Sequence, residues 1–284
     1  MSQPRIETDS SFLSFLNPRI YLISILPALA LFTPNQAGQG LRLVWATFSL
    51  VLLQHGVNLL NDLEDDRRGA DDNKSDSWIR HFKNSAILQK HGLAFFFSGI
   101  FLGLLCLLHF QNLGVVLWSA PFVWAAWAYN KSDKPISYSR FSEWVTAACY
   151  GPGVVVSLAL LCNQSLNLRT ISLSLAFAAL AAAVLLAHQI PQISDDQKVS
   201  KQSFALRHGA RKSSQAIWIL MAGFAFCLFF ANSQGAQLLF LIATSAFLYG
   251  YRLIQQKSWN PGALLEFGTF AVSLNLLTQI IWKN

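Results

Sequence analysis

The sequence predicts an all-α integral membrane protein, a bundle of nine transmembrane helices with its N-terminus in the cytoplasm. Of its 284 residues, 12% are charged and 53% are hydrophobic, whereas a soluble domain carries about 25% charged residues. Nine apolar runs approach the roughly 20 residues that a helix needs to cross a bilayer. Lys and Arg gather on alternate connecting segments, which is the pattern that orients membrane proteins.

The nine apolar runs follow one another along the chain with polar segments between them. They cover Ile20–Phe32, Leu41–Leu60, Leu93–Phe110, Gly114–Tyr129, Trp144–Leu161, Ile171–Ile190, Ala216–Ala231, Leu238–Tyr251 and Ala263–Trp282. Residues 1–18 are polar and lack the basic start and apolar core of a cleavable signal peptide. No polar segment is long enough to link two domains, so we expect residues 1–284 to form one domain with a cytoplasmic N-terminal segment.

The distribution of charge predicts the orientation. If the N-terminus is inside, the outer segments hold only three of the 21 basic residues, Arg42, Arg169 and Lys283. Every Asp and Glu then also falls on or near the inner face. The bias favours a cytoplasmic N-terminus and an external C-terminus. The net charge of +7 is then explained by loops that face anionic lipid, and nucleic-acid binding is not indicated.

The cysteines exclude two further classes of site. All four, Cys106, Cys149, Cys162 and Cys227, lie inside apolar runs, and none forms a CxxC pair. The sequence therefore indicates neither a redox motif nor a cysteine zinc site.

Seven of the fourteen acidic residues lie between Asp62 and Asp76, directly after the second apolar run. If that helix continues, Asn58, Asn61, Asp62 and Asp65 share one face. This face must point into a polar cavity, because charges facing lipid cost several kcal/mol. A solvated acidic loop is the plainer alternative, but packed carboxylates repel each other unless a cation joins them. Hard oxygen ligands of this kind suit Mg²⁺, which is usually held by carboxylates together with substrate phosphates.

A weaker version of this pattern ends the sixth run. His188, Gln192 and Asp195 or Asp196 share a helical face there. Both segments carry a His seven residues before an Asp, since His55 precedes Asp62 by the same interval. The two polar helix ends fall on the same side of the membrane, which predicts one shared site.

Two acidic helix ends with Mg²⁺ between them would bind a diphosphate. The metal would offset the negative charge that develops on the leaving group as the C–O bond breaks. The aromatic and aliphatic bundle would hold a hydrocarbon tail and shield an allylic cation from water. This is the chemistry of prenyl transfer.

The sequence resembles the UbiA family of membrane prenyltransferases. The family's first motif, NDxxD, is matched by Asn61-Asp62-Leu63-Glu64-Asp65, followed by Gly69 and Asp71. The continuation, with Tyr129, Pro135, Ser142-Glu143, Gly151-Pro152 and the stretch from Ser200 to Gly209, is similar to the branch that prenylates 1,4-dihydroxy-2-naphthoate for menaquinone. The match runs in order across most of the chain. Its first motif is specific, and the others support it in combination.

The resemblance implies roles for individual residues, with a polyprenyl diphosphate and a small aromatic acceptor as substrates and Mg²⁺ as cofactor. It also implies the cytoplasmic (inner) membrane of a bacterium, with the active site on the cytoplasmic side. The implied metal ligands are Asp62, Asp65, Asp71, Asp195 and Asp196. The implied substrate-binding residues are Asn58, Asn61, Arg67, Arg80, Lys83, Gln192, Lys201 and Arg207. The implied catalytic residues are Asp62, Asp65, Asp196 and Tyr129.

Ordinary explanations exist for several of these residues. The positive-inside bias alone places Lys and Arg in these loops, although such residues also clamp phosphate oxygens. Tyr129 ends an apolar run, where interfacial aromatic residues are common, although its ring could also steady a cation.

The sequence departs from the family in its second motif, DxxxD. The corresponding segment is Gln192-Ile193-Ser194-Asp195-Asp196, so an amide replaces the first carboxylate. A Gln oxygen can bind Mg²⁺ but brings no charge.

Three alternatives to dihydroxynaphthoate prenylation follow. The same fold could act on a hydroxybenzoate, a homogentisate or a porphyrin. The protein could bind an isoprenoid without catalysis, because of Gln192. A secondary transporter would place its polar residues near mid-bilayer, whereas these acids cluster at one membrane face.

Overall fold

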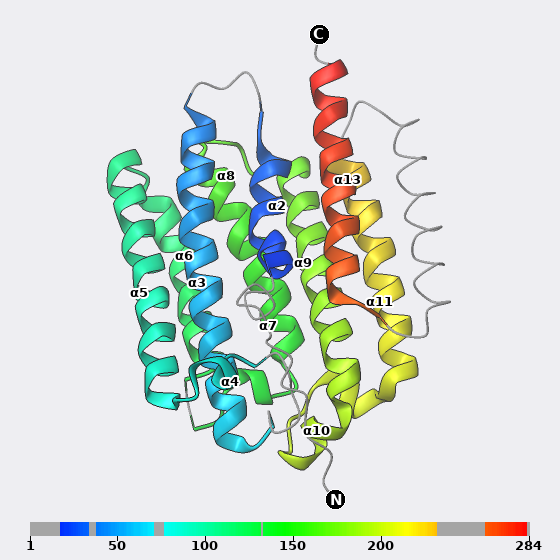
Figure 1. Ribbon diagram of the computed structural model, residues 1–284. Coiled ribbons are helices and arrows are strands. Elements are labelled where there is room, and N and C mark those ends of the chain that lie inside the picture. Colours follow the sequence, from blue (N-terminus) through cyan, green and yellow to red (C-terminus); the bar gives the residue numbers. More distant parts are fainter. Residues whose placement is uncertain (1–17, 34–37, 71–76, 132, 232–258, 283–284) are drawn as a thin grey trace, which may run out of the picture.

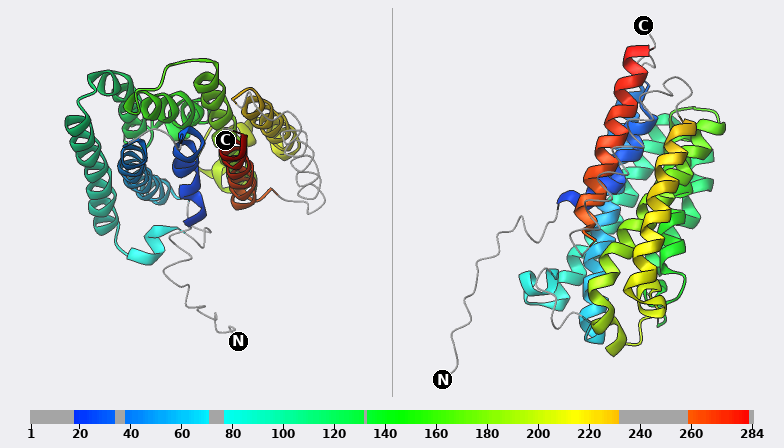
Figure 2. Two further views of the ribbon diagram at one scale, coloured as in Figure 1. Left: turned by 90° about the horizontal axis from the view of Figure 1, so that it is seen from above. Right: turned by 90° about the vertical axis from the view of Figure 1, so that its right-hand side faces the viewer.

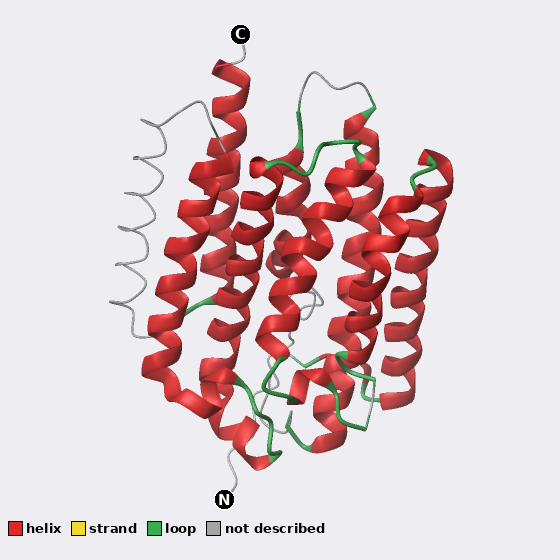
Figure 3. Ribbon diagram, turned by 180° about the vertical axis from the view of Figure 1, so that it is seen from behind, coloured by secondary structure: helices red, strands yellow, loops and turns green. Residues whose placement is uncertain are grey.

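Helices make up all of the regular secondary structure in the residues that the structure describes (Figure 3). The structure is a computed structural model, and it describes residues 18–33, 38–70, 77–131, 133–231 and 259–282. The eighth predicted run, Leu238–Tyr251, lies outside these ranges, as do the metal-ligand candidate Asp71 and most of the polar N-terminal segment. The all-α prediction is confirmed for the described residues.

The helices form one bundle in which neighbours run along each other's length (Figures 1 and 2). In chain order the elements are η1 (Pro18–Tyr21), α2 (Leu22–Leu31), α3 (Gln39–Arg68), α4 (Trp78–Phe82), α5 (Ser85–Phe110), α6 (Leu113–Ala128), η2 (Ile136–Tyr138), α7 (Ser142–Ala148), η3 (Cys149–Val156), α8 (Ser157–Leu161), α9 (Leu168–Gln189), η4 (Ile190–Gln192), α10 (Ile193–Lys198), α11 (Phe204–Ala231) and α13 (Pro261–Trp282).

Among the described residues, five helical stretches are long and apolar enough to cross a membrane. They are Gln39–Arg68, Ser85–Phe110, Ser142–Leu161, Leu168–Lys198 and Phe204–Ala231. Three shorter apolar helices cover Pro18–Leu31, Leu113–Ala128 and Pro261–Leu277. Each of these stretches overlaps one of the predicted runs. The count of nine spans and the cytoplasmic N-terminus remain predictions.

Helix α3 continues well past the apolar run that predicted it. The run ends at Leu60, whereas the helix ends at Arg68 and is closed by Gly69 in the left-handed conformation, with φ +78°. Arg67 and Arg68 occupy the last turn, where positive charge interacts favourably with the helix dipole. The first acidic motif therefore lies on a helix and not in a loop.

Glycines let α3 pack closely against α5. A Cβ atom on Gly56 would lie 2.5 Å from the backbone nitrogen of Phe96 and 2.8 Å from the Gly92 oxygen. Small residues allow this kind of backbone approach between membrane helices, where van der Waals packing supplies much of the association energy. This contact helps to fix the helix that carries the first acidic motif.

Replacing Gly56 with alanine is expected to lower the free energy of unfolding by about 1–3 kcal/mol, because the new methyl group forces the two backbones apart. Thermal unfolding in detergent would measure this. The matched control is Gly223→Ala in α11, where a Cβ atom meets nothing within 4 Å. Equal melting temperatures for the two variants would contradict the prediction.

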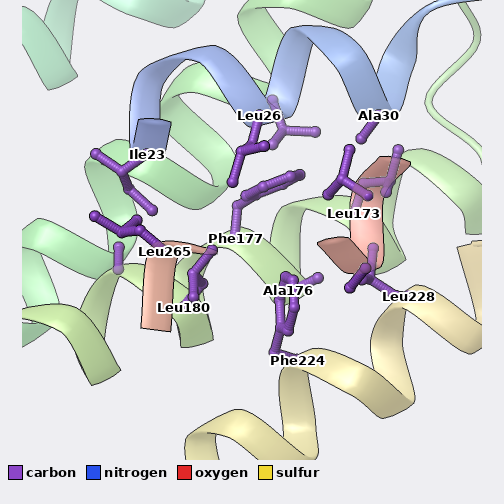
Figure 4. Close-up of a cluster of buried hydrophobic side chains, with 14 of the residues drawn as sticks. Ile23, Leu26, Ala30, Leu173, Ala176, Phe177, Leu180, Phe224, Leu228 and Leu265 are labelled. Atoms are coloured by element: carbon purple, nitrogen blue, oxygen red, sulfur yellow. The ribbon is translucent and has the colours of Figure 1, made fainter. Parts of the chain in front are cut away.

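A second set of contacts joins α2, α9, α11 and α13 in the largest apolar core (Figure 4). Phe177 and Leu180 of α9 lie at its centre and are fully buried. Leu26 packs on them from α2 and Phe224 from α11. Because α9 leads directly into the second acidic motif, this core holds that motif in place.

A wide turn interrupts the helix between α7 and α8. Residues 149–156 form the π-helical element η3, which contains Pro152. Proline has no backbone N–H, so a regular α-helical ladder cannot pass through it. The Pro152 carbonyl oxygen accepts a hydrogen bond from the Trp118 indole nitrogen of α6 at 2.9 Å. Turns of this kind occur often at functional sites, and Tyr150 of this turn lines the cavity described below.

The C-terminal end of α3 lies at the same end of the bundle as α4 and α10 (Figure 1). The fold therefore brings the two acidic motifs to one end, as the sequence predicts.

Candidate active site

A cavity of about 990 Å³ runs into the bundle from this end. Its deeper wall is mostly apolar and includes Phe96, Leu104, Val116, Val154 and Leu161. Its polar wall comes from both acidic motifs. The predicted site residues that line the cavity are Asn58, Asn61, Asp62, Asp65, Tyr129, Gln192 and Lys201.

The first motif contributes two buried carboxylates from consecutive turns of α3. Asp62 is 7% exposed and Asp65 is 4% exposed. Asp62 Oδ2 accepts a hydrogen bond from the backbone N–H of Trp78 at 3.0 Å. The Asn61 amide donates to Asp65 Oδ2 at 3.2 Å. Their helical spacing turns both carboxylates toward the cavity.

The spacing of the second motif suggests one continuous α-helix, but the backbone of this segment is interrupted. Pro191 lies in the 3₁₀ turn η4, which separates α9 from α10. After this turn Asp196 is 2% exposed and accepts a hydrogen bond from Ser203 Oγ at 2.9 Å. Asp195 instead pairs with Lys198 at 2.6 Å, with the lysine side chain 58% exposed. The turn thus directs one carboxylate inward and the other outward.

Lys201 joins the two motifs. Its ammonium nitrogen lies 3.2 Å from Asp65 Oδ1 and 3.7 Å from Asp196 Oδ1. The lysine side chain is 10% exposed, so the three charges interact with little screening by water. The loop that carries Lys201 is fixed by the Lys201 N–H, which donates to the Asp196 carbonyl oxygen at 3.1 Å.

Three supporting residues were not predicted as site residues. The Tyr138 hydroxyl donates to Asp65 Oδ1 at 2.7 Å, and Ser203 donates to Asp196. Burial and the adjacent Asp65 carboxylate raise the pKa of Tyr138, so this phenol stays protonated as a donor. Glu143 Oε1 accepts from the Gln189 amide at 3.0 Å and from the Phe204 backbone N–H at 2.6 Å. Glu143 thereby ties α7 to both sides of the second motif.

Most of the predicted phosphate-binding cations lie elsewhere. Arg67 donates to Gln89 at 2.9 Å on the exposed side of α3. Arg80 and Lys83 line a separate, smaller cavity together with Asp66. Arg207 donates to the Gln202 carbonyl oxygen at 3.1 Å in an exposed position. None of these four is among the residues that line the large cavity. Asp195 and Asp196 do not line it either, and Asp196 is buried beside Lys201, which does.

The donor set at the mouth fits Mg²⁺. The carboxylates of Asp65 and Asp196 face one ammonium group, that of Lys201. Asp62, Asn58 and Asn61 add a carboxylate and two amide oxygens to the cavity wall. Within the described ranges, no three His, Cys, Asp or Glu side chains converge closely enough to hold a metal ion by themselves. Hard oxygen donors of this kind suit Mg²⁺, which commonly uses one or two carboxylates and completes its shell with water and substrate phosphates.

The chain belongs to the UbiA prenyltransferase family, whose sequence profile matches residues 21–271. The resemblance noted from the motifs is thereby confirmed.

Curated relatives point to one branch of the family. The chain is 28% identical over 193 residues to a 1,4-dihydroxy-2-naphthoate octaprenyltransferase of Bacillus subtilis, over 63% of this chain. It is 29% identical over 182 residues to the protein of that name from Mycobacterium tuberculosis, and 28% identical over 214 residues to the one from Haemophilus influenzae. The matches span 57% and 60% of the first two relatives and 68% of the third.

Solved structures share the fold. A UbiA homologue from Archaeoglobus fulgidus bound to GPP and Mg²⁺ superposes with a TM-score of 0.68 at 15% identity, over 95% of this chain and 98% of that one. The same homologue bound to DMAPP and Mg²⁺ gives 0.67 at 16% identity, over 96% and 98%. An apo UbiA homologue from Aeropyrum pernix gives 0.63 at 15% identity, over 94% and 98%.

Proposed function

We propose that this protein transfers a polyprenyl group from its diphosphate to an aromatic acceptor, with 1,4-dihydroxy-2-naphthoate as the first candidate. One observation carries the proposal. Two buried carboxylates, Asp62 and Asp65, line a deep and mostly apolar cavity together with buried Lys201, and the buried carboxylate of Asp196 lies 3.7 Å from that lysine. The mouth fits a metal–diphosphate head group, and the cavity fits a hydrocarbon tail.

Asp62 and Asp65, with Asn58 and Asn61, would hold one Mg²⁺, and Asp196 with Gln192 would hold a second. When bound, Mg²⁺ supplies positive charge that stabilises the diphosphate leaving group. Lys201 is the cation best placed to contact phosphate oxygens, because it already lies between both motifs. Asp71 stays a predicted ligand, and we favour Asp196 over Asp195 because only Asp196 turns inward.

The cavity wall would protect the reacting carbon. Tyr129 lines the cavity, and its hydroxyl lies 3.5 Å from Thr146 Oγ1. Its π face can steady developing cation character at the allylic carbon. The apolar residues exclude the water that would otherwise capture the cation.

The names of the curated relatives favour dihydroxynaphthoate over the other acceptors. The charge bias of the loops favours a bacterial cytoplasmic membrane with the carboxylates on the cytoplasmic side. A protein that binds isoprenoid without catalysis is the second candidate, and Gln192 favours it because one expected carboxylate is missing from the second motif.

The test is an assay of purified protein in nanodiscs with a polyprenyl diphosphate, Mg²⁺ and a panel of aromatic acceptors. We expect a prenylated product and diphosphate release, both lost on chelation of Mg²⁺ and in Asp62→Ala. Product from dihydroxynaphthoate alone would establish that acceptor. Diphosphate binding without turnover on any acceptor would replace our proposal with the binding protein.

A further inference from the structure

A band of four polar side chains crosses the cavity wall away from the carboxylates. They belong to η1, α2 and α3 and are Tyr21, Ser24, Gln54 and His55. Tyr21, Ser24 and Gln54 line the cavity, and their exposed fractions are 8%, 1% and 6%. Buried polar groups in an apolar wall cost free energy unless they are hydrogen-bonded. The hydrogen bonds within this band therefore indicate which of its polar atoms can still bind a ligand.

The band contains two hydrogen-bonded pairs. Ser24 Oγ donates to Gln54 Oε1 at 2.6 Å, and the Gln54 amide donates to the Ile20 carbonyl oxygen at 2.9 Å. The Tyr21 hydroxyl lies 2.6 Å from His55 Nδ1. The Ser24–Gln54 pair is tied to the backbone, whereas the Tyr21–His55 pair joins a phenol hydroxyl to an imidazole nitrogen, two groups that can exchange a proton.

The imidazole ring of His55 is held in a fixed orientation. It packs edge-on against Phe95, with ring centroids 4.5 Å apart, and against Trp78 at 5.5 Å. Trp78 also donates its backbone N–H to Asp62. The pair is therefore connected through one residue to the first acidic motif.

The position along α3 suits a second substrate. His55 and Asp62 lie seven residues apart, which is about 10 Å along a helix axis. On the proposed function, a diphosphate bound at Asp62 would place its allylic carbon farther into the cavity, and the attacking carbon must approach it to about 3–3.5 Å. The acceptor ring would then lie near the level of His55 and its partner Tyr21.

We infer that Tyr21 and His55 form a proton relay that binds and deprotonates the phenolic hydroxyl of the aromatic acceptor. This inference rests on the proposed function and adds the acceptor subsite to it. Tyr21 is the group that contacts the acceptor, and His55 acts through Tyr21. In the tautomer that carries its proton on Nε2, His55 accepts at Nδ1, and the Tyr21 oxygen then keeps its lone pairs for the acceptor's O–H.

The acceptor O–H bond breaks, its proton passes to the Tyr21 oxygen, and the Tyr21 proton passes to His55 Nδ1. The electron pair moves into the ring, the ring carbon bonds to the allylic carbon, and the diphosphate leaves with the electrons of the C–O bond. Where the alkylated carbon carries hydrogen, its proton passes to the released diphosphate and the C–H electrons return to the ring. Where it carries a carboxylate, carbon dioxide leaves and the electrons of that C–C bond return to the ring. In both cases His55 returns its proton through Tyr21 to the acceptor oxygen.

Two variants separate the relay from a structural role. Tyr21→Phe removes the hydroxyl, and His55→Asn keeps an acceptor atom near the position of Nδ1 but removes its basicity. Ser213→Ala is the control, because it removes another buried hydroxyl, which donates to the Gly209 carbonyl at 2.9 Å in α11, away from the cavity. Thermal unfolding and binding of the prenyl diphosphate with Mg²⁺ are measured for all three.

Single-turnover rates are then measured with naphthols of increasing hydroxyl acidity, and diphosphate release is measured without acceptor. We expect both relay variants to lose about 100-fold or more in product formation, with unchanged diphosphate binding and unchanged acceptor-free release. The deficit should shrink as the naphthol becomes more acidic, because an ionised acceptor needs no base.

Several results would overturn the relay. These are wild-type rates in Tyr21→Phe, full activity in His55→Asn, or a deficit that is the same for every naphthol. If the variants also lost diphosphate release in the absence of acceptor, Tyr21 and His55 would have a structural role and would not form a relay. Absence of any prenylated product from the wild-type protein is a separate outcome, which would overturn the proposed function and the relay with it.

Discussion

Replacing Asp65 with asparagine is expected to lower kcat/KM for prenyl transfer by about 100- to 1,000-fold, a range typical for removing one preorganised electrostatic group. Asp65 is the carboxylate on which the site converges, since it contacts Asn61, Tyr138 and Lys201. Asparagine keeps the shape and one acceptor oxygen but removes the charge. The loss should therefore appear mainly in the Mg²⁺ dependence, and the remaining Asp196 carboxylate, 3.7 Å from Lys201, should limit the loss of stability.

The adjacent residue provides the control. Asp66→Asn makes the same chemical change one position along α3, where the side chain is exposed and does not line the large cavity. Its steady-state rates should stay close to wild type at saturating Mg²⁺. Similar losses in both variants would mean that the general negative charge of the helix end matters, and not the position of Asp65.

Replacing Lys201 with methionine is expected to destabilise the metal-free protein and to make its stability depend on Mg²⁺. Removing one partner of a buried ion pair costs about 3–5 kcal/mol, because it leaves uncompensated charge. Here two carboxylates, Asp65 and Asp196, would lose their shared cation. Mg²⁺ would replace that cation and, without the competing ammonium group, bind about tenfold or more tightly.

Thermal unfolding of this variant over a range of Mg²⁺ concentrations checks the prediction, and binding of the prenyl diphosphate should weaken in the same protein. Lys198→Met is the control, because Lys198 pairs with Asp195 in an exposed position on the same short helix. Mg²⁺ should raise the melting temperature of Lys201→Met more than that of Lys198→Met. An equal rise in the two variants would refute the role of Lys201 as the shared cation of Asp65 and Asp196.

The placement of the first acidic motif on one helical face could be predicted because the pattern is local. Asn58, Asn61, Asp62 and Asp65 need only an unbroken helix to share a face, and α3 supplies it. The second half follows less directly, because Pro191 introduces a 3₁₀ turn. The choice between Asp195 and Asp196 depends on that turn, and helical spacing does not determine it.

Contacts between distant segments could not be read from the sequence. Tyr138 reaches Asp65 across 73 positions, and Lys201 reaches it across 136. The basic loop residues show the opposite failure, in which the sequence predicts site residues that lie elsewhere. The positive-inside pattern alone predicts Lys and Arg in these loops, so cations such as Arg67 and Arg207 need no role in the site. Of the five predicted phosphate-binding cations, Lys201 lines the large cavity together with Asp62 and Asp65, whereas Arg67, Arg80, Lys83 and Arg207 do not line it.

The continuity of α3 has a consequence for the product. Its carboxylates and His55 belong to one unbroken helix, clamped against α5 where Gly56 meets Phe96. If the protein acts as we propose, one rigid helix sets the separation between the leaving group and the acceptor, whatever the tail contacts deeper in the bundle. Tails of different length are then expected to change the occupancy of the site and to leave the alkylated ring carbon unchanged.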